Sequence, residues 1–443
     1  MQPEALPLLV FVISISILLF GIIRLKINPF LVLLAVSIFT GLAAGLPITK
    51  VTKLLSDGFG STMGSIGVMI ALGILLGKVL ADAGATEQIA RMFLKSIGAR
   101  FSLLAICITG YIVCIPVFLT AAFIVFMPLL RDLSRKGGIP LVGLVTALTM
   151  AGLATHCIVI PTPGPLAVMA NLKLPVGNFL MWSLVVAIPP SLVGLISARI
   201  FSRQSFMQID TTNFSDKDHD DSRPKPSGIL SLIVLLLPIL LILVGSLMTE
   251  FLPKDHPLNS FFSFIGDKNI AMLIGLAIAG LLLKPYLNKS FDTLVASGGA
   301  DAGLLILIVG AGGAFGSIIN GSGISDNMVK LLSSWHLPLL YTAFILAAIL
   351  RGAQGSATVS AVTVSSIMAP MLLQSSESPV MIGLAICCGS ICLSFPNDSG
   401  FWIISRYSGL TVPQNLRMLS LMSTITGIVG FLTVLLIDAL YRV

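Results

Sequence analysis

Asn397, Asp398 and Ser399 stand in a row in FPNDSGFWII, residues 395–404, within some of the most apolar sequence of the chain. A carboxylate in an apolar medium is costly unless it is paired or neutralised, and such residues usually mark ion or substrate pathways. Asp398 therefore either stays charged beside a cation or hydrogen-bond donors, or takes up a proton. Coupling of a proton to transport and structural capping of a broken helix both fit this position.

PTPGP at residues 161–165 is a second polar break, and it aligns with NDSGF at 397–401. Gly164 and Gly400 correspond at an offset of 236 residues (400 − 164), which places Thr162 opposite Asp398. Freed backbone groups and helix ends at such breaks can bind ions. Ordinary loops at the membrane surface are the alternative. The residues of these two breaks that we expect to bind substrate are Thr162, Gly164, Asn397, Ser399 and Gly400.

RGAQGSATVSAVT, residues 351–363, is a third polar interruption. Its neutral donors and acceptors suit a polyhydroxylated substrate, and Arg351 could meet a carboxylate. The alternative for Arg351 is a positive anchor that reaches toward the membrane surface. The substrate-binding residues expected in this segment are Arg351, Gln354, Ser356 and Thr358.

His156 lies inside an apolar segment, five residues before PTPGP. A histidine there could relay protons near neutral pH, and a histidine hydrogen-bonded in the helix bundle is the alternative. Lys78 and Asp82 are four residues apart, so we expect them to form an ion pair on one helix face.

The composition identifies a polytopic membrane protein. Of 443 residues, 56% are hydrophobic and 10% charged, with a mean hydropathy of +1.02, whereas a soluble protein carries about 25% charged residues. The net charge of +7 is not accompanied by a basic–aromatic cluster that would indicate nucleic-acid binding. The cysteines all lie in apolar segments, which argues against a disulfide framework or a zinc site.

No cofactor and no enzymatic activity is expected. LLILIVGAGGAFGS, residues 304–317, imitates a dinucleotide-binding turn, but membrane segments flank it instead of a βαβ unit. An integral-membrane enzyme would need a nucleophile–base pair, a metal cluster or a cofactor motif, and the sequence displays none of these.

The chain divides into two related halves. Residues 1–202 form a first transmembrane repeat, 203–228 a hydrophilic linker and 229–443 a second repeat. Residues 57–84 align with 296–323 at an offset of 239 (296 − 57), with four glycines in register. We expect an all-α fold of two inverted-topology repeats. The bias of positive residues predicts a cytoplasmic linker and periplasmic termini.

Several apolar segments are too short to span a bilayer, because a crossing helix needs about 20 residues. These segments are expected to be broken helices or re-entrant hairpins, which in transporters surround the substrate site. They are residues 101–115, 117–130, 337–350 and 380–395.

GAGGAFG, RGAQGSATVSAVT, HCIVIPTPGP and NDSGFW, in their places, resemble the gluconate:proton symporter (gluconate permease) family of bacterial inner membranes. The resemblance covers nearly the whole chain. It implies a secondary transporter of the wider ion transporter superfamily that takes up gluconate and related hydroxy acids with a proton. Some members carry D-serine. The chain departs from the family pattern at Thr120, Thr162 and Phe395, where titratable residues are common.

We therefore expect proton-coupled uptake of a small sugar acid or hydroxy acid across the bacterial inner membrane by alternating access. Thr120, beside the break at Pro116, joins the expected substrate-binding residues, and Asp398 and His156 are the expected proton-coupling residues. The expected partners are a small carboxylate, a proton and the lipid bilayer, and a homo-oligomer is compatible with the sequence. A passive facilitator or channel, or a carrier of another carboxylate such as D-serine, is the alternative.

Overall fold

The computed structural model describes residues 5–209, 224–253, 256–324, 327, 338–372, 377–396 and 398–441. These residues form helices joined by short loops, and no strand occurs among them. The predicted all-helical membrane fold is confirmed. The inverted relation of the two halves, and the domain limits at 202 and 229, stay predictions.

The helices of the first half differ widely in length. They are α1 (Ala5–Leu19), α2 (Pro29–Ala43), α3 (Ile48–Asp82), α4 (Ala85–Ile97), α5 (Ser102–Val113), α6 (Leu119–Gly137), α7 (Leu141–Ile158), α8 (Pro163–Asn171), α9 (Val176–Val186) and α10 (Ile188–Ser202). The helices described in the second half are α11 (Gly228–Phe251), α12 (Pro257–Gly266), α13 (Lys268–Leu282), α14 (Phe291–Gly321), α16 (Leu339–Gln354), α17 (Ala357–Leu372), α18 (Pro379–Gly389), α19 (Ser399–Ser408), α20 (Val412–Asn415) and α21 (Met422–Tyr441).

In the described part of the chain, six helical stretches are long and apolar enough to cross a membrane, and the bent pair α12–α13 would make up to seven. The six stretches are Ile48–Asp82, Leu141–Asn171, Val176–Ser202, Gly228–Phe251, Phe291–Gly321 and Val412–Leu440. Other apolar helices are much shorter: α5 has 12 residues and α18 has 11. Three of the four predicted short segments are therefore present as the short helices α5, α16 and α18, whereas the segment predicted at 117–130 belongs to α6, which has 19 residues.

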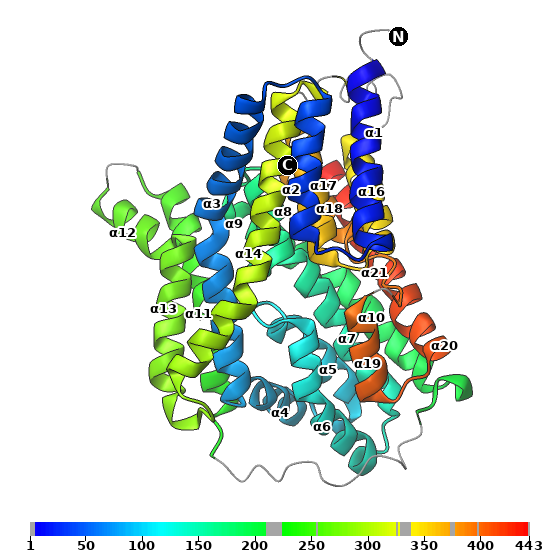
Figure 1. Ribbon diagram of the computed structural model, residues 1–443. Coiled ribbons are helices and arrows are strands. Elements are labelled where there is room, and N and C mark those ends of the chain that lie inside the picture. The colour runs from blue at the N-terminus through cyan, green and yellow to red at the C-terminus, as the bar shows by residue number, and fades with distance from the viewer. Residues whose placement is uncertain are drawn as a thin grey trace.

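The two longest helices, α3 and α14, lie side by side and run antiparallel through the height of the molecule (Figure 1). Near one end, a Cβ on Gly58 of α3 would lie 2.7 Å from the carbonyl oxygen of Gly313, late in α14. Near the other end, Lys78 late in α3 meets Asp301 early in α14. Glycine lacks a side chain, so the two backbones approach closely where Gly58 and Gly313 meet.

The helix pair α7–α8 forms the centre of the molecule, since 94% of the most apolar 18-residue stretch within Leu141–Asn171 is buried. α7 packs against α5 and α10, and α8 packs against α17. A helix that is apolar on all sides belongs in such an interior. The break between α7 and α8 is therefore enclosed by protein, where an irregular backbone can be tolerated at membrane depth.

Candidate functional site

Four interior helices begin directly after a break in the chain. α6 follows residues 114–118, α8 follows 159–162, α17 follows Gly355 and Ser356, and α19 follows 390–398. The first N–H groups of a helix lack partners within the helix and carry a positive partial charge, so each break presents a surface that favours an anion.

The breaks of the two halves meet at Gly164 and Thr358. A Cβ on Gly164 would lie 3.5 Å from Cα of Thr358 and 3.6 Å from Cβ of Ala361. Gly164 is buried at the start of α8, and Thr358 is half-buried at the start of α17. PTPGP and RGAQGSAT, which are distant in sequence, therefore adjoin in the fold.

Arg351, near the end of α16, is the largest charged side chain in the interior, with 2% of its surface exposed. Its Nη2 donates to Oγ of Ser394 and to Oδ2 of Asp398, at 2.5 Å in each case. A membrane-surface anchor would be exposed at its charged end. The anchoring alternative for Arg351 is therefore wrong, because its guanidinium is buried against the break before α19.

Asp398 caps α19 and pairs with Arg351 at the same time. Its Oδ1 accepts a hydrogen bond of 2.8 Å from the backbone N–H of Gly400, and Oδ2 meets Arg351. An N-cap carboxylate satisfies one of the unpaired N–H groups and interacts favourably with the positive helix end. The predicted structural capping is thus present, and so is a cationic partner.

Part of the Arg351 guanidinium has no acceptor. Among the described residues, no hydrogen-bond partner reaches its Nε or Nη1, although both atoms are buried. An unsatisfied donor on a charged, buried group costs free energy, about 1–3 kcal/mol or more. An arginine fork that holds one carboxylate through Nη2 retains donors for a second anion.

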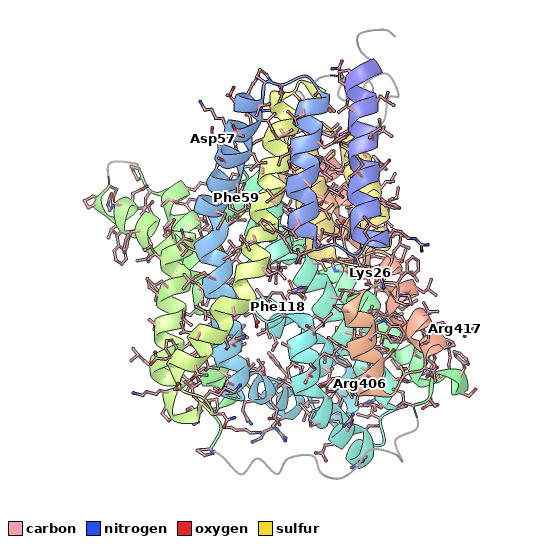
Figure 2. The ribbon with its side chains drawn as sticks, in the orientation of Figure 1. Lys26, Asp57, Phe59, Phe118, Arg406 and Arg417 are labelled. Carbon is pink, nitrogen blue, oxygen red and sulfur yellow. The ribbon has the colours of Figure 1, made fainter. Side chains whose placement is uncertain are left out.

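The charges of Arg351 and Asp398 both act electrostatically on His156. Its ring packs against Phe118 with a centroid separation of 5.2 Å and an interplanar angle of 53°. Phe118 lies at mid-height in the molecule (Figure 2). Within the described part of the chain, Nδ1 of His156 is buried without a hydrogen-bond partner. The hydrogen-bonded core histidine expected as the alternative is not found at this nitrogen.

The remaining predicted residues occupy different surroundings. Thr162 is buried, and its hydroxyl donates to the carbonyl of Val159 at 2.6 Å. The Ser356 hydroxyl caps α17 by accepting from the N–H of Val359 at 3.3 Å. Ser399 begins α19 and is exposed, and Gly400 is buried beneath it.

Of the other three predicted residues, one lines a different cavity, and two are described only in part or not at all. Thr120 lines a separate cavity next to Phe118. Gln354 ends α16, and its backbone alone is described. Asn397 lies outside the described residues.

Sequence reasoning missed Ser394, which holds the break before α19 in place. Its hydroxyl meets Arg351, its N–H donates to Ser423, and its carbonyl accepts from Ser420 at 2.5 Å. Ser394 is fully buried. The available signal was its position four residues before Asp398 in the same polar break.

The predicted ion pair between Lys78 and Asp82 is wrong. Lys78 Nζ lies 2.7 Å from Oδ2 of Asp301 on α14. Asp82 Oδ2 instead accepts from the backbone N–H groups of Asn288 and Lys289, at 2.7 and 3.1 Å. Packing of α3 against α14 thus overrides the local spacing of four residues.

The described residues contain no group of three or more histidine, cysteine or acidic side chains that could hold a metal ion. What the described residues bring together is a buried guanidinium with donors that meet no partner among them, helix N-termini and hydroxyls, which is the donor chemistry that suits an anion. Comparison with known families shows which kind of protein contains these residues. The model described as GntP family permease matches residues 6–440. The chain belongs to the GntP permease family.

Curated relatives of this GntP-family chain extend over its full length. The Escherichia coli (strain K12) high-affinity gluconate transporter is 31% identical, covering 98% of this chain and 99% of the relative. The Zymomonas mobilis gluconate permease is 34% identical over 96% of each chain. The Inner membrane permease YgbN of Escherichia coli is 31% identical over 95% of each. The chain is accordingly a membrane transporter of the gluconate-permease type and not an enzyme.

Solved structures share the fold. The Alcanivorax borkumensis YdaH transporter matches with a TM-score of 0.65 at 14% identity, covering 93% of this chain and 98% of that one. Neisseria gonorrhoeae MtrF matches with a TM-score of 0.66 at 13% identity, covering 95% and 96%. At such low identity the likeness concerns the architecture alone, and it agrees with a transporter fold of broken helices.

Proposed function

We propose that this GntP permease takes up a small sugar acid or hydroxy acid such as gluconate, together with a proton, by alternating access across the bacterial inner membrane. The orientation with periplasmic termini, predicted from the positive residues, belongs to the same proposal. Relatives named for gluconate transport support the substrate class. The observation that carries the proposal is the buried Arg351 beside Asp398, whose Nε and Nη1 atoms meet no hydrogen-bond partner among the described residues.

Each group at the breaks takes a role in this proposal. Arg351 and the helix N-termini hold the substrate carboxylate, because a guanidinium fork matches a planar carboxylate. The hydroxyls and amides hold the substrate hydroxyls, and the glycines let the substrate approach the backbone. Those residues are Thr120, Thr162, Gly164, Gln354, Ser356, Thr358, Asn397, Ser399 and Gly400.

Competition for Arg351 provides a route to coupling. Ionised Asp398 occupies Nη2 of Arg351 and repels a second carboxylate. A proton on Asp398 removes that negative charge, so the guanidinium becomes available to the substrate anion. Substrate and proton then enter together, with no net charge added to the site. His156, on which the charges of the pair act, is the proposed donor or acceptor of that proton.

Two cavities support the alternating-access part. One, of about 460 Å³, lies beside Lys78 and Asp301, and the other, of about 530 Å³, lies beside Thr62 and Ser317. They flank opposite ends of the antiparallel α3–α14 pair. Paired inverted elements that present cavities on opposite sides of a central site are typical of secondary transporters.

Uptake of D-gluconate into proteoliposomes, with and without an imposed pH gradient, tests the proposal. We expect accumulation driven by a proton gradient in the wild type. Asp398→Asn should keep the N-cap but lose dependence on the gradient, because asparagine caps helices well and carries no proton to transfer. Gradient-driven accumulation that is unchanged in Asp398→Asn would remove Asp398 from the coupling mechanism.

The same vesicles separate the alternatives. A passive facilitator would equilibrate gluconate but would not accumulate it, whatever the pH gradient. A carrier of another carboxylate would leave gluconate outside and accept a different acid. The screen therefore includes other sugar acids, short hydroxy acids and D-serine.

A further inference from the structure

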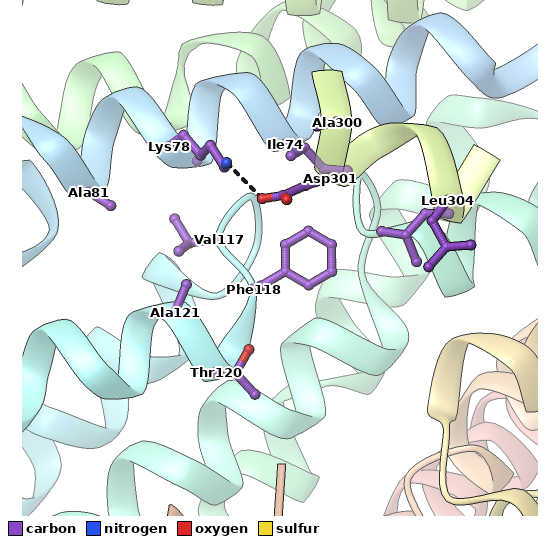
Figure 3. Close-up of a pocket in the computed structure, with 12 residues that line it drawn as sticks. Ile74, Lys78, Ala81, Val117, Phe118, Thr120, Ala121, Ala300, Asp301 and Leu304 are labelled. Atoms are coloured by element: carbon purple, nitrogen blue, oxygen red, sulfur yellow. Dashed lines mark ion pairs between the residues drawn. The ribbon is translucent and has the colours of Figure 1, made fainter. Parts of the chain in front are cut away.

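The cavity of about 460 Å³ lies between the last turns of α3, the early part of α14 and the start of α6 (Figure 3). Its size is in the range of small-molecule pockets. Thr120 and Phe118 both line this cavity, and the ring of Phe118 also packs against His156. Phe118 therefore connects the cavity wall to the histidine on which the charges of Arg351 and Asp398 act.

Lys78 and Asp301 are the only charged residues among the described lining of this cavity. Lys78 Nζ contacts Oδ2 of Asp301 at 2.7 Å, and the two side chains are 29% and 62% exposed. Figure 3 shows the pair at the cavity wall, across from Phe118. Because the remaining wall is largely apolar, the lysine is the group there that can attract an anion.

The repeat alignment pairs Lys78 and Asp301 with neutral residues. Shifting the cavity residues by 239 positions gives, for six of the twelve, residues that line the second cavity, of about 530 Å³. The corresponding pairs are Ile74 with Gly313, Gly77 with Gly316, Lys78 with Ser317, Ala81 with Asn320, Ala300 with Ser61, and Asp301 with Thr62. At the positions that correspond to Lys78 and Asp301, the second cavity thus has the neutral residues Ser317 and Thr62, while the charged residues in its lining, Asp57 and Lys173, stand elsewhere.

We propose that Lys78 is a carboxylate-binding residue of this cavity and that Asp301 is its resident anion, which the substrate carboxylate displaces on its way to or from Arg351. The inference rests on the proposed transport of a small carboxylate. Displacement is feasible because a partly exposed ion pair contributes little to stability, and an incoming carboxylate forms an equivalent pair with the lysine.

The proposal predicts opposite effects of neutralising the two partners. Asp301→Asn removes the competitor and should lower the apparent KM for D-gluconate, by about two- to fivefold for a pair of this exposure. Lys78→Gln removes the cation and should raise the KM at least as much. A purely structural tie between α3 and α14 predicts that both variants change in the same direction.

The measurement is D-gluconate counterflow in proteoliposomes, with the KM determined for wild type, Lys78→Gln, Asp301→Asn and Lys78→Arg. Size-exclusion profiles and thermal unfolding of the purified variants confirm that each is folded. Lys78→Arg keeps a cation and should remain within about twofold of the wild type, since arginine also pairs with carboxylates. Opposite shifts in the two neutralised variants support the proposal, and equal or parallel shifts overturn it.

A failure of the proposed function has a different signature. If the wild type shows no gluconate counterflow, gluconate transport itself fails before any variant is considered. If the wild type transports gluconate and Asp301→Asn raises the KM as Lys78→Gln does, transport stands and Lys78 is only a structural partner of Asp301.

Discussion

Arg351 has both a structural and a proposed binding role, and these roles can be separated. Its Nη2 holds Ser394 and Asp398, while Nε and Nη1 meet no acceptor among the described residues. Burying a charge is tolerated when it is paired, and removing one partner of a buried pair leaves the other uncompensated. Single substitutions at the pair should therefore affect stability as well as transport.

Arg351→Gln is expected to reduce gluconate uptake by about 30-fold or more, because losing one partner of a buried charge pair costs about 2–5 kcal/mol. Arg351→Lys should recover little of the loss, since a lysine point charge cannot hold Ser394, Asp398 and a substrate carboxylate in one plane. Initial rates of radiolabelled gluconate uptake measure both variants, normalised to protein in the membrane.

The double variant Arg351→Gln with Asp398→Asn is the matched control. It restores charge balance, so its thermal stability should exceed that of either single variant, while its uptake should stay low. Recovery of uptake in the double variant would show that Arg351 acts only as the partner of Asp398.

The sequence identified Asp398 and Arg351 as candidate site residues, but it did not predict which residues they contact. Asp398 as an N-cap follows from its place before a helix, because aspartate accepts from the first N–H groups. Its partner Arg351 is 47 residues away, and nothing in the spacing predicts that contact. Lys78 is a second example. The spacing of four residues predicted an ion pair with Asp82, whereas the packing of α3 against α14 brings Lys78 to Asp301.

At the scale of elements, proline and glycine located the breaks, while the lengths of α3 and α14 were underestimated. Residues 63–81 and 302–320 are continuous apolar stretches, and they predict only the later parts of helices that begin at Ile48 and Phe291. The early turns of both helices are rich in polar residues and glycine, so hydropathy alone places the start of each helix too late. These turns are helical because each helix packs along the other.

The close approach of α3 and α14 can be tested with two glycines of one helix. Gly313→Ala should destabilise the protein by about 1–3 kcal/mol, since its Cβ would collide with Thr62 and lie 2.8 Å from the carbonyl of Gly58. Gly303→Ala is the control, because no atom lies within 4 Å of its Cβ position. That variant should be neutral or gain up to about 1 kcal/mol from better helix propensity. Equal thermal unfolding temperatures for both would contradict the close contact.

The end of the polar linker is fastened to α4 by an ion cluster. Glu87 accepts from Lys225 at 2.6 Å and from Arg91 at 2.7 Å. Burial raises the pKa of Glu87, but the hydrogen bonds and charges of Lys225 and Arg91 outweigh it and hold the pKa below the ordinary 4.5. The stabilisation is complete above that ordinary pKa and is lost as the pH falls through the lower folded value.

Glu87→Gln should therefore lower thermal stability at pH 7, by about 1 kcal/mol for a cluster that is partly exposed. The difference from the wild type should shrink as the pH is lowered stepwise toward 3, since the wild type then loses the same charge. Glu250→Gln, at an exposed carboxyl near the end of α11, is the control and should show no such trend. A difference that is independent of pH would exclude the ion cluster as its cause.

At the scale of the whole molecule, the predicted repeat relation can be compared with the contacts between the two halves of the chain. α8 packs on α17 through Asn171, whose side-chain amide donates to Ser365 and Ser366 at 2.8 and 3.0 Å. The repeat counterpart of Asn171 at an offset of 236 is Tyr407 (171 + 236), whose carbonyl accepts from Arg131 of α6 at 2.7 Å. Contacts between the halves thus recur at corresponding places, as expected if both halves move in related ways.

Ala300 and Ser61 test this relation, because they are repeat counterparts, are both exposed, and line different cavities. In separate variants, Ala300→Cys and Ser61→Cys should react with a membrane-impermeant maleimide from opposite sides of the membrane. Gluconate should change the two labelling rates in opposite directions, because closing one access path opens the other. The wild type is the control, since its own cysteines are all buried. Labelling of both positions from one side would contradict the inverted arrangement, and parallel changes with substrate would contradict alternating access.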